Sequence, residues 1–292
     1  MLAIVGSSSH LTKKLCEILH QAGSPFIVIE ARKALSCTGN LESDVCLGYE
    51  RLKVAFGTSQ VHTLIWLAGI TSYTDCQKPD AYYLNALMIP RILSRLLDRL
   101  TLSLVFVSTN TVYGDECPDR SVARIPIPRI GYARQKLIAE SYLNNCLLCD
   151  TKSMLKVVRL TKMIGCFTKP IDEWIARINK GLSISAFTDL HCAPITWDFA
   201  AVSILKTAAS DRQGTYHVTG ANDLSYFSIA RRLFDWLPTE QIIPVESSQV
   251  GYNLIFSQKN TGLAFSSPFC YSQASVDFFA QLRAEIQCDY FN

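Results

Sequence analysis

The sequence predicts an α/β fold in which a doubly wound parallel sheet is accompanied by a smaller C-terminal lobe. Short, continuously apolar runs alternate with amphipathic helical stretches through the first half of the chain. Such runs are typical of parallel strands that helices cover on both faces. After about residue 165, proline and short mixed segments replace this alternation. The 292 residues are 49% hydrophobic and 18% charged, which is sufficient for a large core.

The expected elements follow one another in a regular order. Strands are expected at 2–5, 26–30, 61–69, 102–109, 155–161 and 214–220. Helices are expected at 11–23, 79–100 and 225–237, and a further one carries Tyr132. Gly23 suits the end of the first helix. Folds of this class bind their ligands at the carboxyl ends of the parallel strands.

The change of pattern also divides the chain. We expect a dinucleotide-binding domain at 1–165 and a smaller substrate-binding lobe at 166–292, interleaved with the last elements of the main sheet. The sequence contains no internal repeat, low-complexity tract or long polar linker that would mark a clean boundary.

Composition argues against several functional classes. The net charge of +3 and the lack of a basic run disfavour nucleic acid and anionic membranes as partners. The eleven cysteines are scattered and odd in number, which indicates thiols in a reducing compartment. The one Cys-x-x-Cys, Cys146 to Cys149, has no second pair, so we expect no metal site. No leader or membrane span is expected, and the protein is predicted to be soluble and cytoplasmic.

A small polar turn, VGSSSHLT, lies between the first strand and the first helix. A dinucleotide-binding fold places its pyrophosphate over the helix N-terminus at this point. Of the three glycines usual there, only Gly6 is present, and Ser9 and Thr12 occupy the other two places. Their hydroxyls can hydrogen-bond a phosphate, whereas a Cβ at Ser9 can crowd it. An ordinary N-cap is the alternative interpretation.

Charged residues follow the second strand. Glu30 can accept hydrogen bonds from an adenosine ribose, which favours NAD. Arg32 and Lys33 can instead pair with the 2′-phosphate of NADP. A solvated charged loop is a further alternative, so the cofactor preference stays open.

Tyr132 and Lys136 are four positions apart on the helical stretch GYARQKLIAE, which places them on one face. A phenol beside an ammonium is a candidate proton donor. The pair alone carries little weight, because Tyr49 and Lys53 have the same spacing.

Several motifs occur in a fixed order: GSSSHLT, LAGIT, YTDCQKPDAYYLN, VFVSTNTVYGD, GYARQKLIAE, VVRLTKMIG and GTYHVTG. Together they resemble the extended short-chain dehydrogenase/reductase family of nucleotide-sugar epimerases, dehydratases and reductases, over most of residues 1–220. The similarity is greatest to the dTDP-4-dehydrorhamnose reductase branch. Asn110 and Thr111 stand where the family's dehydratases carry an Asp-Glu pair, which argues against dehydration.

The resemblance implies a Rossmann-type fold, NAD or NADP as cofactor, and a nucleotide-sugar substrate. Its Ser/Thr–Tyr–Lys set corresponds to Thr109, Tyr132 and Lys136, whereas Tyr49 and Lys53 have no such threonine upstream. Dimers are common in the family, so a homodimer is expected.

The resemblance also implies binding residues. The expected cofactor-binding residues are Gly6, Ser7, Ser8, Ser9, His10, Leu11, Glu30, Arg32, Leu67, Ala68, Gly69, Asn85, Tyr132 and Lys136. The expected substrate residues are Thr71, Asn110, Lys162 and Trp174. A core position is the alternative for Trp174, because aromatic side chains usually go to cores.

The expected chemistry is hydride transfer between nicotinamide and a keto carbon of a nucleotide-linked deoxyhexose. Tyr132 donates the proton, Lys136 helps to lower the tyrosine pKa and holds the ribose, and Thr109 binds the substrate oxygen. The alternatives are an epimerase with tightly held NAD and a nucleotide- or sugar-binding relative without catalysis.

Overall fold

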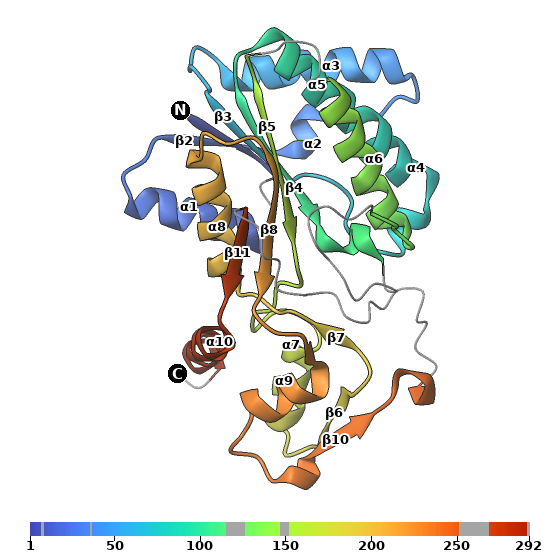
Figure 1. The fold of residues 1–292 in the computed structure, drawn as a ribbon, viewed down its shortest axis with the longest axis vertical. Coiled ribbons are helices and arrows are strands. Elements are labelled where there is room, and N and C mark those ends of the chain that lie inside the picture. The colour runs from blue at the N-terminus through green and yellow to red at the C-terminus, as the bar shows by residue number, and fades with distance from the viewer. Residues whose placement is uncertain (7–8, 36, 115–125, 147–151, 251–268, 291–292) are drawn as a thin grey trace. The chain divides into compact units, whose positions relative to one another are not determined.

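The structure, a computed structural model, describes residues 1–292 except 7–8, 36, 115–125, 147–151, 251–268 and 291–292. It contains a seven-stranded sheet in the order β11-β8-β5-β4-β3-β1-β2 (Figure 1). The strands are β1 (Leu2–Val5), β2 (Phe26–Ile29), β3 (Thr63–Trp66), β4 (Ser103–Thr109), β5 (Met154–Leu160), β8 (Gly214–Gly220) and β11 (Cys270–Gln273). The registered pairs β1–β2, β1–β3, β3–β4 and β8–β11 are all parallel. The predicted doubly wound parallel α/β fold is therefore confirmed.

Contacts divide the chain into two compact units. The first comprises the described residues of Met1–Val112, Pro128–Arg159 and Ala201–Tyr216. The second comprises the described residues of Tyr113–Ile127, Leu160–Ala200 and His217–Asn292. Residues 201–216, which a division at 165 assigns to the second lobe, belong to the first unit.

Helices cover the sheet of the first unit. They are α1 (His10–Gln21), α2 (Ala31–Ala34), α3 (Leu41–Phe56), α4 (Pro79–Tyr82), α5 (Ile89–Arg99) and α6 (Gly131–Cys146). Helices α3, α5 and α6 lie together on one side of the strands, and α1 lies on the other (Figure 1). Buried apolar side chains of the strands and of α3, α5 and α6 form one core cluster.

Strand register brings the expected binding segments to one edge of the sheet. Val5, the last residue of β1, pairs with Ile29 of β2 and with Trp66 of β3. The residues that follow these strands therefore leave the sheet side by side. Because β1 lies between β2 and β3, the strand order reverses at β1, which makes this position the topological switch point of the sheet. Open parallel sheets bind their ligands at such a point.

The predicted helix at 79–100 is interrupted by a π-helical turn. The chain passes from α4 through π-helical Tyr83–Met88 into α5. Asn85 lies in this turn, and turns of this kind often occur at functional sites.

The second unit has its own small sheets and core. Strand β6 (Ile184–Phe187) pairs in parallel with β10 (Ile242–Val245), and β7 (His191–Cys192) pairs antiparallel with β9 (Leu224–Ser225). Its helices are α7 (Ile171–Ile178), α9 (Tyr226–Leu233) and α10 (Ser275–Tyr290), and α8 (Trp197–Ala209) begins in this unit and continues in the first. The sequence predicted strand β8. It also predicted α9, with a C-terminal end later than the observed one, but it did not predict α7, α8 or α10.

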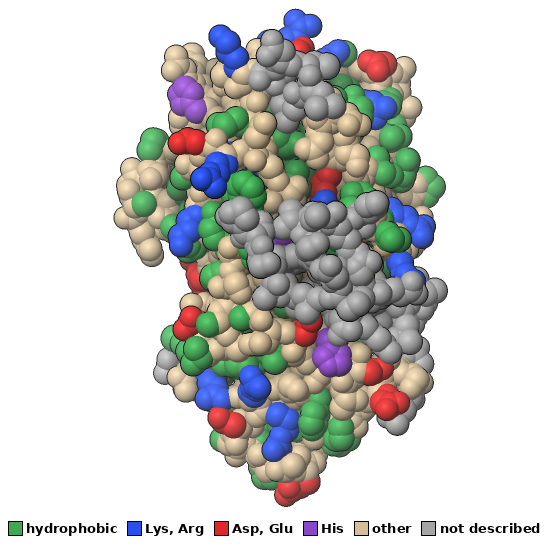
Figure 2. Space-filling view, viewed as in Figure 1, with side chains coloured by type: hydrophobic (Ala, Val, Ile, Leu, Met, Phe, Trp, Pro, Cys, Tyr) green, Lys and Arg blue, Asp and Glu red, His purple; other side chains and the backbone are tan. Residues whose placement is uncertain are grey.

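Lys, Arg, Asp and Glu side chains are interspersed among the described residues on the face drawn in Figure 2. This distribution agrees with the small net charge of +3. Among the helices of the described residues, none combines the length and the apolar character that crossing a membrane requires.

Candidate active site

Gly6 follows Val5, the last residue of β1, and turns the chain towards α1. Its φ of +126° is one that other residues rarely adopt, and a Cβ there would lie 3.1 Å from the Leu67 Cβ and 3.3 Å from the Ala68 nitrogen. The turn after β1 is thus pressed against the segment after β3, which only a glycine allows. Helix α1 begins at His10, so its N-terminus and its dipole lie at this turn.

The two hydroxyl residues in the places of the missing glycines close the turn from within. Thr12 donates its hydroxyl hydrogen to the carbonyl of Gly6, so Ser9 must be the donor in the 2.9 Å bond between the two hydroxyls. Ser9 in turn accepts a hydrogen bond from the Thr12 backbone N–H at 3.1 Å. Both hydroxyl hydrogens are therefore used inside the turn, so neither Ser9 nor Thr12 has a hydroxyl hydrogen left for a phosphate.

The N-cap interpretation of Ser9 and the phosphate-turn interpretation are compatible. Ser9 is the N-cap of α1 with φ −91° and ψ 148°, an extended conformation that any residue can adopt. The conformational objection to serine at this place does not apply, because no positive φ is needed. Ser7 and Ser8 lie outside the described residues.

Three charged side chains follow the end of β2. Glu30 precedes the four-residue helix α2, and its carboxylate accepts a hydrogen bond from the Lys33 ammonium at 3.1 Å. Arg32 is exposed on the same helix. An acidic and a basic candidate for contact with the adenosine ribose therefore both lie at the end of β2.

The segment after β3 is fixed by Asn85. The Asn85 amide accepts a hydrogen bond from Ile70 N at 3.0 Å and donates to Ile70 O at 2.8 Å. It also donates to the side chain of Gln135 on α6 at 2.8 Å, and Gln135 donates to the Cys76 carbonyl at 2.8 Å. These bonds make Asn85 a support of neighbouring elements, and its expected contact with the cofactor stays a prediction. Thr71 is exposed in the same segment.

Thr109 ends β4 in a buried position. Its hydroxyl donates to the Thr111 hydroxyl at 3.0 Å and accepts from the Thr111 backbone N–H at 3.2 Å. Asn110, also buried, begins the single turn that follows. The strand therefore delivers its threonine to the carboxyl edge of the sheet, as the sequence predicted.

Tyr132 and Lys136 lie on α6, as expected. The Tyr132 ring packs at 6.0 Å from the ring of Tyr73, which comes from the segment after β3. Lys136 is buried, donates to the carbonyl of Val107 on β4 at 2.9 Å and lies 4.7 Å from the centre of the Phe106 ring. The helix is thus attached to the end of β4 through its lysine.

Burial shifts the pKa values of Tyr132 and Lys136 in opposite directions. It raises the pKa of Tyr132 above the usual 10, and the charges of Tyr73, Cys76 and Glu140 act in the same direction. Burial lowers the pKa of Lys136 from 10.5 to about 8, against the opposing effect of Glu140. The lowering of the tyrosine pKa that we expected Lys136 to help produce is not found in the protein by itself. The physical reason is that burial has the largest effect on the pKa of the phenol, while the Lys136 ammonium is bound to the backbone of β4.

The sequence analysis missed a buried ion pair beside these residues. Glu140 on α6 receives two hydrogen bonds from the Arg159 guanidinium of β5, at 2.6 and 3.2 Å on one carboxylate oxygen. The Ser108 hydroxyl of β4 donates to the other oxygen. The spacing of Tyr132, Lys136 and Glu140 repeats a step of four, which places Glu140 on the same face of the helix but does not identify Arg159 as its partner.

The residues described above lie in a region that matches a known protein family. The sequence profile of the NAD dependent epimerase/dehydratase family matches residues 2–195. The chain belongs to this family. Its matched region includes the turn at Gly6, the segment after β3, Thr109 and the Tyr132–Lys136 face of α6.

Solved structures of epimerase/dehydratase relatives share the fold. The dTDP-4-dehydrorhamnose reductase of Bacillus anthracis, in complex with NADP, has a TM-score of 0.76 at 19% identity over 98% of this chain and 96% of its own. The corresponding reductase of Yersinia enterocolitica has a TM-score of 0.71 at 20% identity over 98% of both chains. The UDP-glucose 4-epimerase of Thermotoga maritima has 0.67 at 14% identity over 84% of this chain and 85% of its own. No curated protein sequence matches the chain.

Two of the expected substrate residues belong to the second unit. Lys162 is exposed. Trp174 is buried, its ring lies 6.3 Å from the Phe234 ring, and its indole N–H donates to the Ser185 carbonyl at 2.9 Å. Trp174 therefore occupies the core position that was its alternative interpretation.

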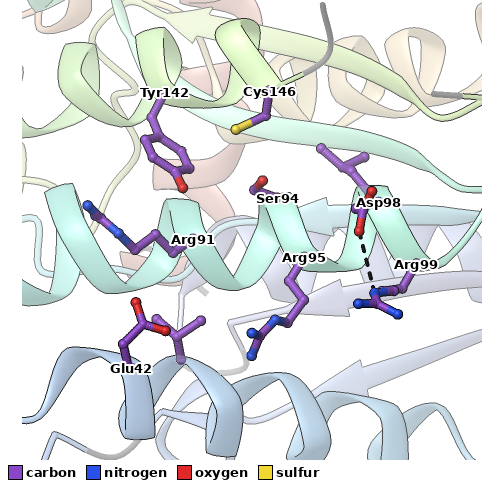
Figure 3. Close-up of a pocket in the computed structure, with 10 residues that line it drawn as sticks. Glu42, Arg91, Ser94, Arg95, Asp98, Arg99, Tyr142 and Cys146 are labelled. Atoms are coloured by element: carbon purple, nitrogen blue, oxygen red, sulfur yellow. Dashed lines mark ion pairs between the residues drawn. The ribbon is translucent and has the colours of Figure 1, made fainter. Parts of the chain in front are cut away.

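A pocket of about 480 Å³ lies elsewhere in the first unit, between α3, α5 and α6 (Figure 3). It is lined mainly by charged side chains, among them Arg91, Arg95 and Glu42, and Tyr142 faces it from α6. Ten helical residues separate Tyr142 from Tyr132, about 15 Å along the axis. None of the residues expected to bind cofactor or substrate lines this pocket.

The structure also shows where the second Tyr–Lys pair lies and how the candidate metal ligands are arranged. Tyr49 is buried in α3, and the Lys53 ammonium lies 5.4 Å from the centre of its ring and 3.6 Å from the Glu50 carboxylate. The tyrosine of this pair therefore belongs to the core, and its lysine lies at the surface beside Glu50. Among the described residues, no group of three or more His, Cys, Asp and Glu side chains has the arrangement of a metal site; Cys149 lies outside them.

Proposed function

We propose that the chain is an NAD(P)-dependent reductase of a 4-keto nucleotide-linked deoxysugar, with Tyr132 as the proton donor. The observation that carries the proposal is that Lys136, on the helix of Tyr132, donates to the Val107 carbonyl of β4, the strand that Thr109 ends, in the unit that also holds the Gly6 turn. Family membership supports the general class of nucleotide-sugar chemistry. The dTDP-4-dehydrorhamnose reductases with the same fold support a reductase within that class.

The residues present fit a dinucleotide. Gly6 leaves space where a Cβ would press on Leu67 and Ala68, and the N-terminus of α1 presents a favourable dipole to a pyrophosphate. In this proposal NAD(P)H supplies the hydride. His10 and Leu11 would contribute backbone N–H groups, and Glu30 and Arg32 would meet the adenosine ribose.

The protonation of Tyr132 favours reduction. Since burial raises the pKa of Tyr132, the phenol keeps its proton at neutral pH. A reductase needs this form at the start of the reaction, because the developing alkoxide must receive a proton. An epimerase that begins with oxidation needs the opposite form. Lys136 would hold the ribose, Thr109 would bind the substrate oxygen, and Thr71, Asn110 and Lys162 would contact the nucleotide sugar.

The test is reductant consumption by the purified chain with dTDP- and UDP-linked 4-keto-6-deoxyhexoses. We expect NADH or NADPH to be oxidised in proportion to sugar reduced. Tyr132→Phe should reduce turnover by about 100-fold or more. Tyr49→Phe is the matched control, since it removes a hydroxyl from the second Tyr–Lys pair, and should leave turnover unchanged.

Two results would replace the proposal. Cofactor that purifies with the chain, together with interconversion of nucleotide sugars without net consumption of NAD(P)H, would indicate the epimerase. Lack of NADH and NADPH binding would indicate a non-catalytic relative. The expected homodimer stays a prediction, which light scattering on the purified chain can test.

A further inference from the structure

Three ionisable side chains follow one another along one face of α6. Tyr132, Lys136 and Glu140 are each four residues apart, so they form a single stripe towards the sheet. Lys136 is 6% exposed and Glu140 is 2% exposed. Charges so removed from water interact strongly, because little solvent screens them.

The hydrogen bonds of Glu140 show that it is a carboxylate. Arg159 donates to one oxygen at 2.6 and 3.2 Å and reaches the other at 3.4 Å. Ser108 donates its hydroxyl hydrogen to that second oxygen. Since both oxygens accept hydrogen bonds, the ionised form is the one that fits. The side chain is thus held on two sides, by β4 and by β5.

The same strand binds the lysine. Phe106 and Ser108, two residues apart on β4, face α6, where Phe106 lies under the Lys136 ammonium and Ser108 bonds Glu140. The Val107 carbonyl between them accepts the lysine N–H. Lysine and glutamate are therefore fixed against consecutive positions of one strand.

We propose that Glu140, held by Arg159 and Ser108, is a positioning residue that keeps Lys136 protonated inside the protein and so sets the upper pH limit of the site. The link to turnover rests on the proposed function, whereas the effect on Lys136 does not. If the proposal is correct, the ion pair is part of the site's electrostatics and does more than join α6 to β5.

The charged and titratable groups around Lys136 support this role. On its own helix these are Tyr132 and Glu140; the segment before α4 contributes Cys76, and β5 contributes Arg159 through its pair with Glu140. Burial raises the pKa of the Cys76 thiol, so this group is neutral near pH 7. Among these groups, Glu140 is the one that carries a negative charge at neutral pH. Its carboxylate opposes the burial that lowers the lysine pKa to about 8.

The experiment follows the titration of Lys136 directly, by NMR of the full chain with 13C-labelled lysine. The Lys136 signal is identified by its loss in Lys136→Met. We expect a midpoint near 8 in the wild type and a midpoint lower by about one pH unit in Glu140→Gln. An unchanged midpoint in Glu140→Gln would overturn the proposal.

A matched control and a second variant keep the result decisive. Asp44→Asn neutralises another buried carboxylate of the same unit, bound by Thr38 and Tyr83, and should leave the Lys136 midpoint unchanged. If Glu140→Gln does not fold because Arg159 is left with a buried charge, the double variant Glu140→Gln/Arg159→Met removes both charges, a change that buried pairs often tolerate. It should lower the midpoint by less than Glu140→Gln does, because the positive charge of Arg159 that opposes Glu140 is removed as well. A midpoint at or above the wild-type value in it would contradict the proposal.

The pH profile of turnover separates this inference from the proposed function. In Glu140→Gln the alkaline fall in turnover should move to lower pH together with the lysine midpoint. A shifted midpoint in a chain whose wild type shows no reductase turnover would support the role of Glu140 and reject the proposed function. Reductase turnover by the wild type, together with an unshifted Lys136 midpoint in Glu140→Gln, would support the proposed function and reject the role of Glu140.

Discussion

The side-chain amide of Asn85 donates a hydrogen bond of 2.8 Å to the side chain of Gln135, and this bond joins the π-helical turn to α6. Gln135 lies between Tyr132 and Lys136 in the sequence, and both amides are buried. Asn85 also bonds both backbone groups of Ile70. One amide therefore fixes the segment after β3 and the helix that carries the candidate proton donor.

Replacing Asn85 by alanine should destabilise the chain. The change leaves the buried side-chain oxygen of Gln135 and the N–H of Ile70 without this partner, and each such loss costs about 1–3 kcal/mol. We expect the free energy of unfolding, measured with urea, to fall by about 2–4 kcal/mol. Asn144→Ala, at an exposed position of α6, is the control and should change it by less than about 0.5 kcal/mol. Equal effects of the two variants would show that the Asn85 bonds contribute little.

Gly69→Ala should disturb the same segment in a different way. Gly69 has a φ of +151°, and a Cβ there would lie 3.0 Å from the Asn85 side-chain oxygen. Gly23 also has a positive φ, +62°, but a Cβ there would meet nothing within 4 Å. Both alanines should cost about 1 kcal/mol in backbone strain. Only Gly69→Ala should in addition weaken NAD(P)H binding, measured by fluorescence titration; equal binding by the two variants would contradict this.

The hydrogen bonds of the Ser9 and Thr12 hydroxyls predict which of two substitutions in the turn after β1 has the larger effect. Thr12→Val removes the donor to the Gly6 carbonyl while keeping the shape of the side chain. Ser9→Gly restores the usual glycine and loses an N-cap, which costs only a few tenths of a kcal/mol. We therefore expect Thr12→Val to weaken cofactor binding and thermal stability more than Ser9→Gly does. The opposite order in both measurements would contradict this expectation, and tighter cofactor binding by Ser9→Gly than by the wild type would indicate that Ser9 crowds the phosphate.

The sequence predicted what is encoded locally and missed what depends on packing. The strands of the first unit are apolar runs, and their carboxyl ends meet because parallel strands are in register, so the positions of Gly6, Leu67 and Thr109 could be inferred. Neither the bond between Asn85 and Gln135 nor the pair of Glu140 and Arg159 has a local signature, since 50 and 19 residues separate the partners.

Much of the second unit was missed for a related reason. Strands such as β7 and β9 are only two residues long, which is too short for a hydrophobic period to be recognised. The effect of burial on the pKa of Tyr132 was also not foreseen. The sequence shows that a lysine is near, but it does not show how much water the fold removes from the phenol.

The lowered lysine pKa predicts a specific dependence of stability on pH. Lys136 titrates near 8 in the folded chain and at 10.5 when unfolded. Below pH 8 both states hold the proton, and between about 8 and 10.5 only the unfolded state does, so stability rises with pH in that window. Relative to Lys136→Met, the wild type should gain up to about 3 kcal/mol in free energy of unfolding from pH 7.5 to 10.5. Lys53→Met, at an exposed position, should show no such change relative to the wild type. Urea unfolding of the three proteins across this range gives the answer, and a constant difference between wild type and Lys136→Met would show that the fold does not disfavour the lysine's charge.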